Sequence, residues 1–247
     1  MLSIASMIAN SGILLAQTNE KTNNSQTQDV DISFEPPNRG TPQSSEGTGS
    51  RGDCLDKSSL PPLKSLGGKT NLKFTTSERP TFWVYIPYTR SEASYGEFSL
   101  QDGERDIYRT RFQLPTKPGI VGVSLPDTAV PLNVGRQYRW YFDINCSVSA
   151  SSDYSATPAS LTGIIERVNL SDNVARELNT TSNSLNQVAS YAKHGIWYDA
   201  LTELAQLRLQ QPENPDFKQA WDKLLSDRYV NLAKISSEPI LGILPSW

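Results

Sequence analysis

The sequence predicts an α+β fold that is mainly β, in which an antiparallel β-sandwich is followed by a small C-terminal helical segment. Two observations carry this prediction. Between residues 72 and 170, apolar residues alternate with polar ones, and Gly and Pro recur between the alternating stretches. From Ser171 onward, the apolar residues recur every three or four positions instead. A period of two is typical of strands, and a period near 3.6 is typical of helices.

The N-terminal region differs from the rest in composition. No charged side chain precedes Glu20, and an apolar stretch ends at Ala16, so residues 1–16 resemble a signal peptide. A basic start is missing, and a disordered cytosolic tail is the alternative. Residues 17–53 are rich in Gln, Thr, Asn, Ser, Pro and Gly and are expected to form a disordered linker. The expected organisation is a signal peptide over 1–16, a linker over 17–53, the sandwich over 54–170 and the helical segment over 171–247.

Six stretches of the predicted sandwich alternate as strands do. In the first, TFWVYIP, the side chains of Phe82 and Val84 share one face, and those of Trp83 and Tyr85 share the other. The other five are EFSLQD, IYRTRFQL, GIVGVSLP, QYRWYFDIN and LTGIIERVNL. Short strands separated by turn residues at roughly ten-residue spacing are typical of an antiparallel sandwich.

A motif in this region, Leu132-x-x-Gly135-x-x-Tyr138-x-Trp140, resembles the turn and strand of immunoglobulin-like and fibronectin-like sandwiches. There the glycine makes the turn, and the tyrosine hydroxyl binds the backbone at the corner. No cysteine lies two residues after Tyr138, so the antibody disulfide is not carried over.

Three helices are expected in the C-terminal segment. Asp172 is expected to cap the first, Gly195 permits a tight turn into the second, and Asn214 with Pro215 begins the third. The expected helices run over 172–193, 197–210 and from 215 onward.

The turn at Gly195 lies in a stretch that resembles one tetratricopeptide repeat. The matching residues are Tyr191, Gly195, Trp197, Ala200, Leu204, Leu207 and Pro212. No second unit follows, and a solenoid needs about three repeats to bury a continuous core. The unit is therefore expected to pack on the sandwich or on the third helix, and a free peptide-binding module is the alternative.

Composition narrows the classes of function. The net charge is -3, and no segment carries the basic excess that nucleic-acid binding needs. Two cysteines and one histidine are too few for a zinc site, so no metal or cofactor is expected. No stretch reaches the ~18 apolar residues of a membrane-spanning helix.

Candidate catalytic residues have structural explanations. His194, the single histidine, lies in a predicted turn after a helix, where the helix C-terminus favours a cation. Glycoside hydrolysis needs a pair of carboxylates. Glu97, Asp102, Glu104 and Asp106 offer such pairs, yet residues 102–106 have the sequence of a hairpin turn. The sequence therefore predicts a protein that is not an enzyme.

Aromatic residues give a candidate interaction surface. Trp83, Tyr85 and Tyr141 crowd two predicted strands, and Trp197 opens a predicted helix. On a solvent-exposed face, these side chains stack on sugar rings or on a partner protein. If the second sheet and the helices cover both faces, they belong to the core, which is the commoner arrangement.

Cys54 and Cys146 are the two cysteines of the chain. In an exported protein we expect them to form a disulfide, which would fasten the start of the sandwich to a central strand. Two separate buried thiols in a reducing compartment are the alternative.

Six landmarks follow one another along the chain: RGDC, TTSERPTFWVYIPYT, EFSLQD, YRWYFDINC, IERV and GIWYDAL. With them the chain resembles the domain-of-unknown-function 928 family of cyanobacteria. The resemblance implies export to the periplasm or cell envelope, Cys54 and Cys146 as family positions, and a partner protein in the envelope.

The expected function is that of an exported cell-envelope binding or accessory protein without catalytic activity, which acts through protein–protein interaction. A carbohydrate-active hydrolase or a carbohydrate-binding module on the β-sandwich is the alternative. A third reading is a structural envelope protein that its disulfide stabilises and that binds no specific ligand.

Overall fold

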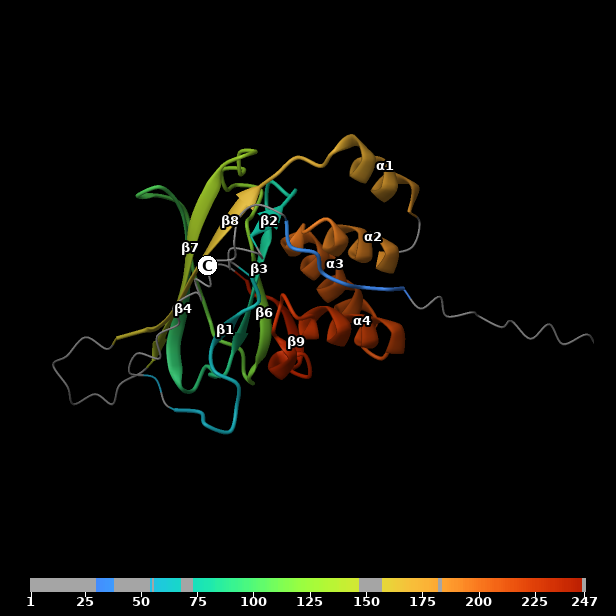
Figure 1. Ribbon diagram of the computed structural model, residues 1–247. Helices are drawn as coiled ribbons and strands as arrows, with labels where there is room; N and C mark the ends of the chain where they lie inside the picture. The colour runs from blue at the N-terminus through green and yellow to red at the C-terminus, as the bar shows by residue number, and fades with distance from the viewer. Residues whose placement is uncertain are drawn as a thin grey trace, which may run out of the picture.

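The computed structural model describes residues 30–37, 54, 56–67, 73–146, 157–181 and 184–245 of the 247-residue chain, and these ranges form two β-sheets and four α-helices (Figure 1). The strands are β1 (Lys64–Ser65), β2 (Phe74–Thr75), β3 (Thr81–Ile86), β4 (Ala93–Asp102), β5 (Arg105–Phe112), β6 (Gly119–Ser124), β7 (Gln137–Cys146), β8 (Ala159–Arg167) and β9 (Ile240–Ile243). The helices are α1 (Asp172–Thr180), α2 (Ser184–Lys193), α3 (Trp197–Gln210) and α4 (Pro215–Ser226), and a 3-10 turn covers Ala233–Ile235. The expected mainly β, α+β fold is confirmed.

The two sheets pack face to face. One has the strand order β1-β3-β6-β9, and the other has the order β2-β8-β7-β4-β5. The ring of Phe82 on β3 lies 4.7 Å from the ring of Phe98 on β4 and 6.1 Å from that of Trp140 on β7, measured between centroids. These aromatic contacts across the sheets form the centre of the core. Among the named strands, the pairings are antiparallel except for β2 with β8 and β6 with β9, which are parallel.

The helices cover the outer side of the four-stranded sheet, which gives the molecule three layers (Figure 1). The indole nitrogen of Trp83, on β3, donates a 3.1 Å hydrogen bond to the hydroxyl of Thr202 on α3. The indole nitrogen of Trp197 donates a 2.7 Å bond to the carbonyl of Leu66, next to β1. The helical segment is thus docked on the sheets as expected, and the alternative of a free module is wrong.

The first predicted helix is interrupted. Instead of one helix over 172–193, α1 ends at Thr180 and α2 begins at Ser184, and the N-cap of α1 is Ser171 rather than Asp172. The hydroxyls of Thr180 and Thr181 both donate to the carbonyl of Glu177. Threonine side chains that bind nearby backbone carbonyls compete with the helical pattern, which explains the break.

The C-terminal strand crosses the expected boundary between sandwich and helical segment. After α4, the chain returns to the sheet, where Ile240 of β9 lies opposite Ile120 of β6. The four helices therefore lie between β8 and β9 along the chain, and the four-stranded sheet is completed only by the segment that follows them.

The corner at the start of β7 forms as the motif predicts. The Tyr138 hydroxyl accepts a 2.8 Å hydrogen bond from the backbone nitrogen of Asn133, and Gly135 has a φ of 74°. A left-handed backbone of this kind favours glycine. The bond fixes the turn between β6 and β7 to the second sheet.

We expect Tyr138→Phe to lower the free energy of unfolding by about 1 kcal/mol, because the Asn133 amide loses its acceptor. Urea denaturation of the full chain measures this change. Tyr141→Phe, on the same strand, is the matched control and is expected to change stability by less than about 0.5 kcal/mol. Equal effects of the two substitutions would contradict the role given to the corner.

Candidate functional site

The predicted aromatic surface does not exist. Trp83, Tyr85 and Trp197 are each at most 2% exposed, so their assignment as an interaction surface is wrong. Helix α3 contacts Trp83 through Thr202, and Trp83, Tyr85 and Trp197 all belong to the hydrophobic core, as the core alternative described. Tyr141 points outward from β7 and is half-buried.

His194 lies just after α2 and is not part of a catalytic arrangement in the described residues. Its Nε2 atom lies 3.4 Å from a carboxylate oxygen of Glu177, on α1. The neighbouring Ser190 and His194 side chains lower the pKa of Glu177. The contact joins the two helices on either side of the break.

The predicted carboxylates lie on β4, on β5 and in the turn between them, and arginines neutralise three of them. Glu97 pairs with Arg109 and Arg111, and Asp106 pairs with Arg109. Asp102 pairs with Arg136, and Glu104 is exposed in the turn. The Arg109 bond lowers the pKa of Asp106. A general acid needs a raised pKa, so Asp106 does not suit that role.

Asp143 is a carboxylate that the sequence analysis missed. It lies on β7 directly opposite Glu97 on β4, on the outward side of the five-stranded sheet. Burial raises the pKa of Asp143, and the charge of Glu97 adds to the rise. The pair thus combines a carboxyl group with a raised pKa and a second carboxyl group that forms ion pairs with two arginines. Alternation along β7 predicts which face of the sheet Asp143 lies on. The pairing of β7 with β4, which the sequence does not show, places it opposite Glu97.

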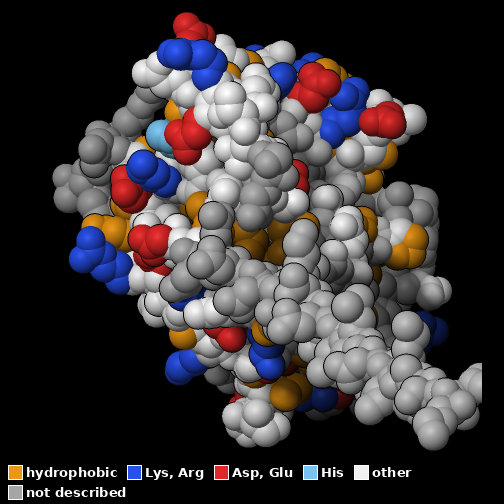
Figure 2. Space-filling model, turned by 90° about the vertical axis from the view of Figure 1, so that its right-hand side faces the viewer, with side chains coloured by type: hydrophobic (Ala, Val, Ile, Leu, Met, Phe, Trp, Pro, Cys, Tyr) orange, Lys and Arg blue, Asp and Glu red, His pale blue; other side chains and the backbone are white. Residues whose placement is uncertain are grey.

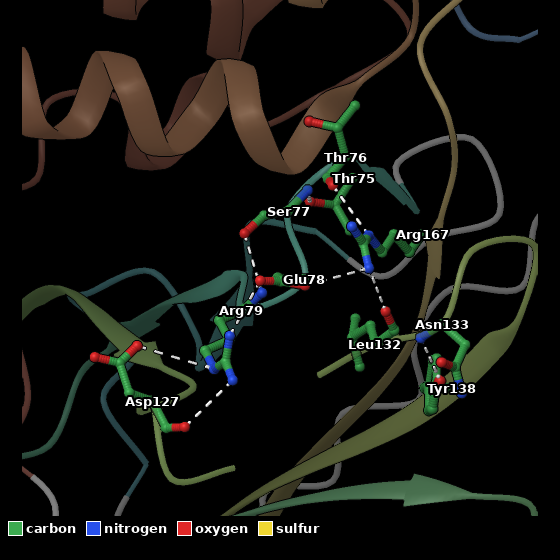
Figure 3. A network of polar contacts seen from close by, with 10 residues as sticks. All are labelled: Thr75, Thr76, Ser77, Glu78, Arg79, Asp127, Leu132, Asn133, Tyr138 and Arg167. Atoms are coloured by element: carbon green, nitrogen blue, oxygen red, sulfur yellow. Dashed lines mark hydrogen bonds and ion pairs between the residues drawn. The ribbon is translucent and has the colours of Figure 1, made fainter. Parts of the chain in front are cut away.

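A polar network joins three chain segments: residues before β3, the end of β8, and the connection between β6 and β7 (Figure 3). The Arg167 guanidinium donates to the carbonyls of Leu132 at 2.7 Å and of Thr76 at 3.2 Å. Arg79 donates to the carbonyl of Asp127 at 3.2 Å, and Glu78 pairs with both arginines. Because both guanidinium groups donate hydrogen bonds to backbone carbonyls, the network cross-links these three segments.

A second polar cluster fastens α3 to β2. The Asp199 carboxylate accepts hydrogen bonds from the Thr75 hydroxyl at 2.7 Å, from the Thr76 nitrogen at 3.1 Å and from the Thr76 hydroxyl. Burial raises the pKa of Asp199 although these bonds oppose the rise. Burial and the charge of Asp199 also raise the pKa of Glu203, one turn later. The first turn of α3 is therefore anchored by a largely desolvated carboxylate.

Residues 30–37, which we call the strap, lie extended across the helices (Figure 1). Ile32 is 4% exposed and Phe34 is 1% exposed, whereas Asp31, Ser33 and Glu35 face outward. The Phe34 ring meets the Trp197 ring edge-on, at 5.2 Å between centroids. The expectation of a disordered linker does not hold for these eight residues; the rest of 17–53 and the predicted signal peptide over 1–16 lie outside the described residues.

The strap also uses its backbone. The Phe34 nitrogen donates a 3.2 Å hydrogen bond to Asp227, just after α4, and the Glu35 nitrogen donates a 3.1 Å bond to the carbonyl of Ala192 in α2. At Gly195, where φ is +71°, an added Cβ would lie 2.9 Å from both the Glu35 carbonyl oxygen and the Pro37 ring. Glycine is required there by the turn and by the close approach of the strap.

We call the surface under the strap the helical face; it is formed by α2, the turn at Gly195, the start of α3 and the residue after α4. Figure 2 views this side of the molecule and shows hydrophobic side chains near its centre, with charged side chains toward the rim. The sequence carried one signal for the strap, the alternation of Val30, Ile32 and Phe34 within a polar stretch.

The cysteine prediction is confirmed, because the structure bonds Cys54 to Cys146 with their Cα atoms 5.3 Å apart. Among the described residues, no helix has the length and apolar character to cross a membrane. The same part of the chain holds no group of three or more His, Cys, Asp or Glu side chains arranged to bind a metal ion.

Comparisons with known proteins identify a family. Residues 46–240 match the model of the family described as Domain of Unknown Function (DUF928), and the strap precedes the matched region. No curated protein and no solved structure matches the chain. Since the match spans well over half of the sequence, the chain belongs to the DUF928 family.

Proposed function

We propose that the protein is an exported cell-envelope binding or accessory protein that acts through protein–protein interaction and has no catalytic activity. One observation carries the proposal: the helical face holds an extended segment by backbone hydrogen bonds and by buried side chains together. Proteins that recognise peptides combine these two kinds of contact, the first for affinity and the second for specificity.

The proposed location is the periplasm or cell envelope. The Cys54–Cys146 disulfide supports export, because disulfides persist in oxidising compartments and are rare in the cytosol. The proposed signal peptide over residues 1–16 agrees with this location.

For the architecture, we propose an immunoglobulin-like sandwich that carries one tetratricopeptide-like unit. The order β1-β3-β6 in one sheet and β8-β7-β4-β5 in the other corresponds to A-B-E and G-F-C-C′ of that sandwich. The hydrogen bond of Tyr138 corresponds to its tyrosine corner. For the helices, the supporting observations are the tight turn at Gly195 and the full burial of Ala200 where α2 and α3 approach.

The proposal is tested by capturing partners from envelope fractions with the full, disulfide-bonded chain, followed by calorimetry with each purified candidate. We expect a partner that binds with saturable stoichiometry. Gly195→Ala is expected to weaken this binding at least about tenfold, because the added Cβ obstructs the helical face. Gly103→Ala is the matched control, since Gly103 also has a positive φ but no atoms near its Cβ position. The absence of any saturable partner would overturn the proposal.

A second candidate is a carbohydrate-active hydrolase or carbohydrate-binding module. The observation that favours it is the Glu97–Asp143 pair, because glycoside hydrolysis needs two carboxyl groups and burial raises the pKa of Asp143, as a general acid requires. Envelope polysaccharides incubated with the wild type and with Asp143→Asn separate the candidates. Turnover that the substitution abolishes would establish the hydrolase and refute a non-catalytic role. Glycan binding lost in Tyr141→Ala would favour the binding module.

A further inference from the structure

We propose that the strap is a displaceable competitor on the helical face. We further propose that the face accepts partner segments of the same kind: extended peptides with an aliphatic residue, an aromatic residue two positions later and a proline three positions after that. This inference rests on the proposed function, since it names the class of partner that binds there. In the strap, these positions are Ile32, Phe34 and Pro37.

The first argument is that the hydrogen-bond acceptors for the strap belong to the helices and are held in place without it. Asp227 accepts from the Tyr229 nitrogen through Oδ1, which leaves Oδ2 for Phe34. Ala192 lies in the last turn of α2, where carbonyls lack partners within the helix. Its carbonyl also accepts from Gly195 and keeps a lone pair for Glu35. A peptide from another chain would find the same acceptors.

The second argument concerns the wall that receives the aromatic side chain. Trp197 contacts Phe34, yet its orientation is fixed independently of Phe34 by its hydrogen bond to the carbonyl of Leu66, next to β1. The contact surface for an aromatic ring is therefore fixed by the sandwich and not by the strap. Preorganisation of this kind lowers the cost of binding.

The third argument concerns the backbone of the bound segment. The chain passes so close to Gly195 that an added β-carbon would meet Glu35 and Pro37 at 2.9 Å. Only an extended segment can pass there, and proline favours an extended backbone without needing a donor. Asp31, Ser33 and Glu35 face outward, so the face places few demands on those positions.

The fourth argument comes from the extent of the family. The DUF928 match begins at residue 46, whereas the strap ends at residue 37. The helical face thus belongs to the family domain, and the strap is a segment outside the matched region that lies upon it. A tethered segment has an effective concentration in the millimolar range, which suffices to exclude weak ligands until a stronger one displaces it.

The test uses the full chain with a selective protease site inserted within residues 38–53. The protein is folded, cut and passed through gel filtration, which separates the released N-terminal piece. A fluorescent peptide with the sequence of residues 29–38 is then titrated by anisotropy. We expect the cut chain to bind it about 100-fold more tightly than the uncut chain, in which the tethered strap competes. A peptide with Phe34→Ala should not bind, and one with Ser33→Ala should bind like the parent.

A second variant tests the same idea without cleavage. In the uncut chain, Phe34→Ala should release the strap and open the face to the parent peptide, whereas a Ser33→Ala chain should stay closed. If the cut chain unfolds on losing the N-terminal piece, or keeps it without exchange, the strap is a fixed part of the core and the inference fails.

The two proposals can fail separately. Capture of an envelope partner by the full chain, together with refusal of the peptide by the cut chain, would overturn this inference and leave the proposed function standing. Peptide exchange at the helical face without any envelope partner would support the displaceable strap and count against the proposed function.

Discussion

Replacing Cys54 and Cys146 together by serine is expected to lower the free energy of unfolding by about 4 kcal/mol. The two cysteines are 92 positions apart, and their bond ties the residue at the start of the sandwich to the end of β7. In the chain-entropy model, a cross-link over such a loop restricts the unfolded chain by about 4–5 kcal/mol. Since a typical domain has only about 5–15 kcal/mol of stability, this one bond decides much of it.

Urea denaturation of the wild type and of the Cys54→Ser/Cys146→Ser variant measures the difference. A reductant should shift the wild-type midpoint toward that of the double variant and leave the variant itself unchanged. A double variant that unfolds within about 1 kcal/mol of the wild type would contradict the importance given to the bond.

The second large effect is expected at the junction of α3 with β2, where Asp199→Ala should lower the free energy of unfolding by about 3 kcal/mol. The substitution leaves the Thr75 hydroxyl and two donors of Thr76 without their acceptor. Hydrogen bonds to a charged group are each worth about 1.5–3 kcal/mol, and the threonine hydroxyls can recover part of this by rotating to other acceptors. Glu213→Ala, in the exposed loop before α4, is the control and should be near neutral.

The raised pKa of Asp199 gives this junction a pH dependence of defined sign. Its folded-state pKa lies above the ordinary value of 3.8, so the stability linked to protonation is fully present below 3.8 and is lost as the pH rises through the folded-state pKa. As the pH falls from 7 toward 4, the wild type should therefore gain stability relative to Asp199→Asn, which does not titrate. Denaturation series at several pH values test this, and a relative loss of wild-type stability toward acid would reverse the assignment.

How far the fold could be predicted from the sequence depended on whether a signal was local. Strands β3 to β8 followed from alternation over six or more residues, and α3 followed from its period and from Pro212. Strands β1 and β2 have two residues each, too short for any period. The break before Ser184 required weighing threonine bonds against the apolar spacing. Strand β9 depends on a pairing partner that is distant in sequence.

For the candidate sites too, local features could be predicted from the sequence, whereas contacts between distant segments could not. The burial of Trp83 could not be settled from β3 alone, because α3 covers it from another part of the chain. Asp143 gained interest only through its register with Glu97. The strap was missed because residues 17–53 were judged by their average composition, which is polar, although Val30, Ile32 and Phe34 alternate within them. The disulfide was predictable, because the chain offers a single possible cysteine pair.

The parallel pairing of β9 with β6 has a consequence for biosynthesis. The backbone groups along the free side of β6 must wait for Ile240–Ile243, which follow only after all four helices have been made. At ordinary rates of translation, that interval lasts on the order of ten seconds. During this time the nascent sheet presents a bare edge, which is a template for pairing with other chains. We therefore expect the growing polypeptide to depend on being held unfolded, for example by a chaperone, until β9 has emerged.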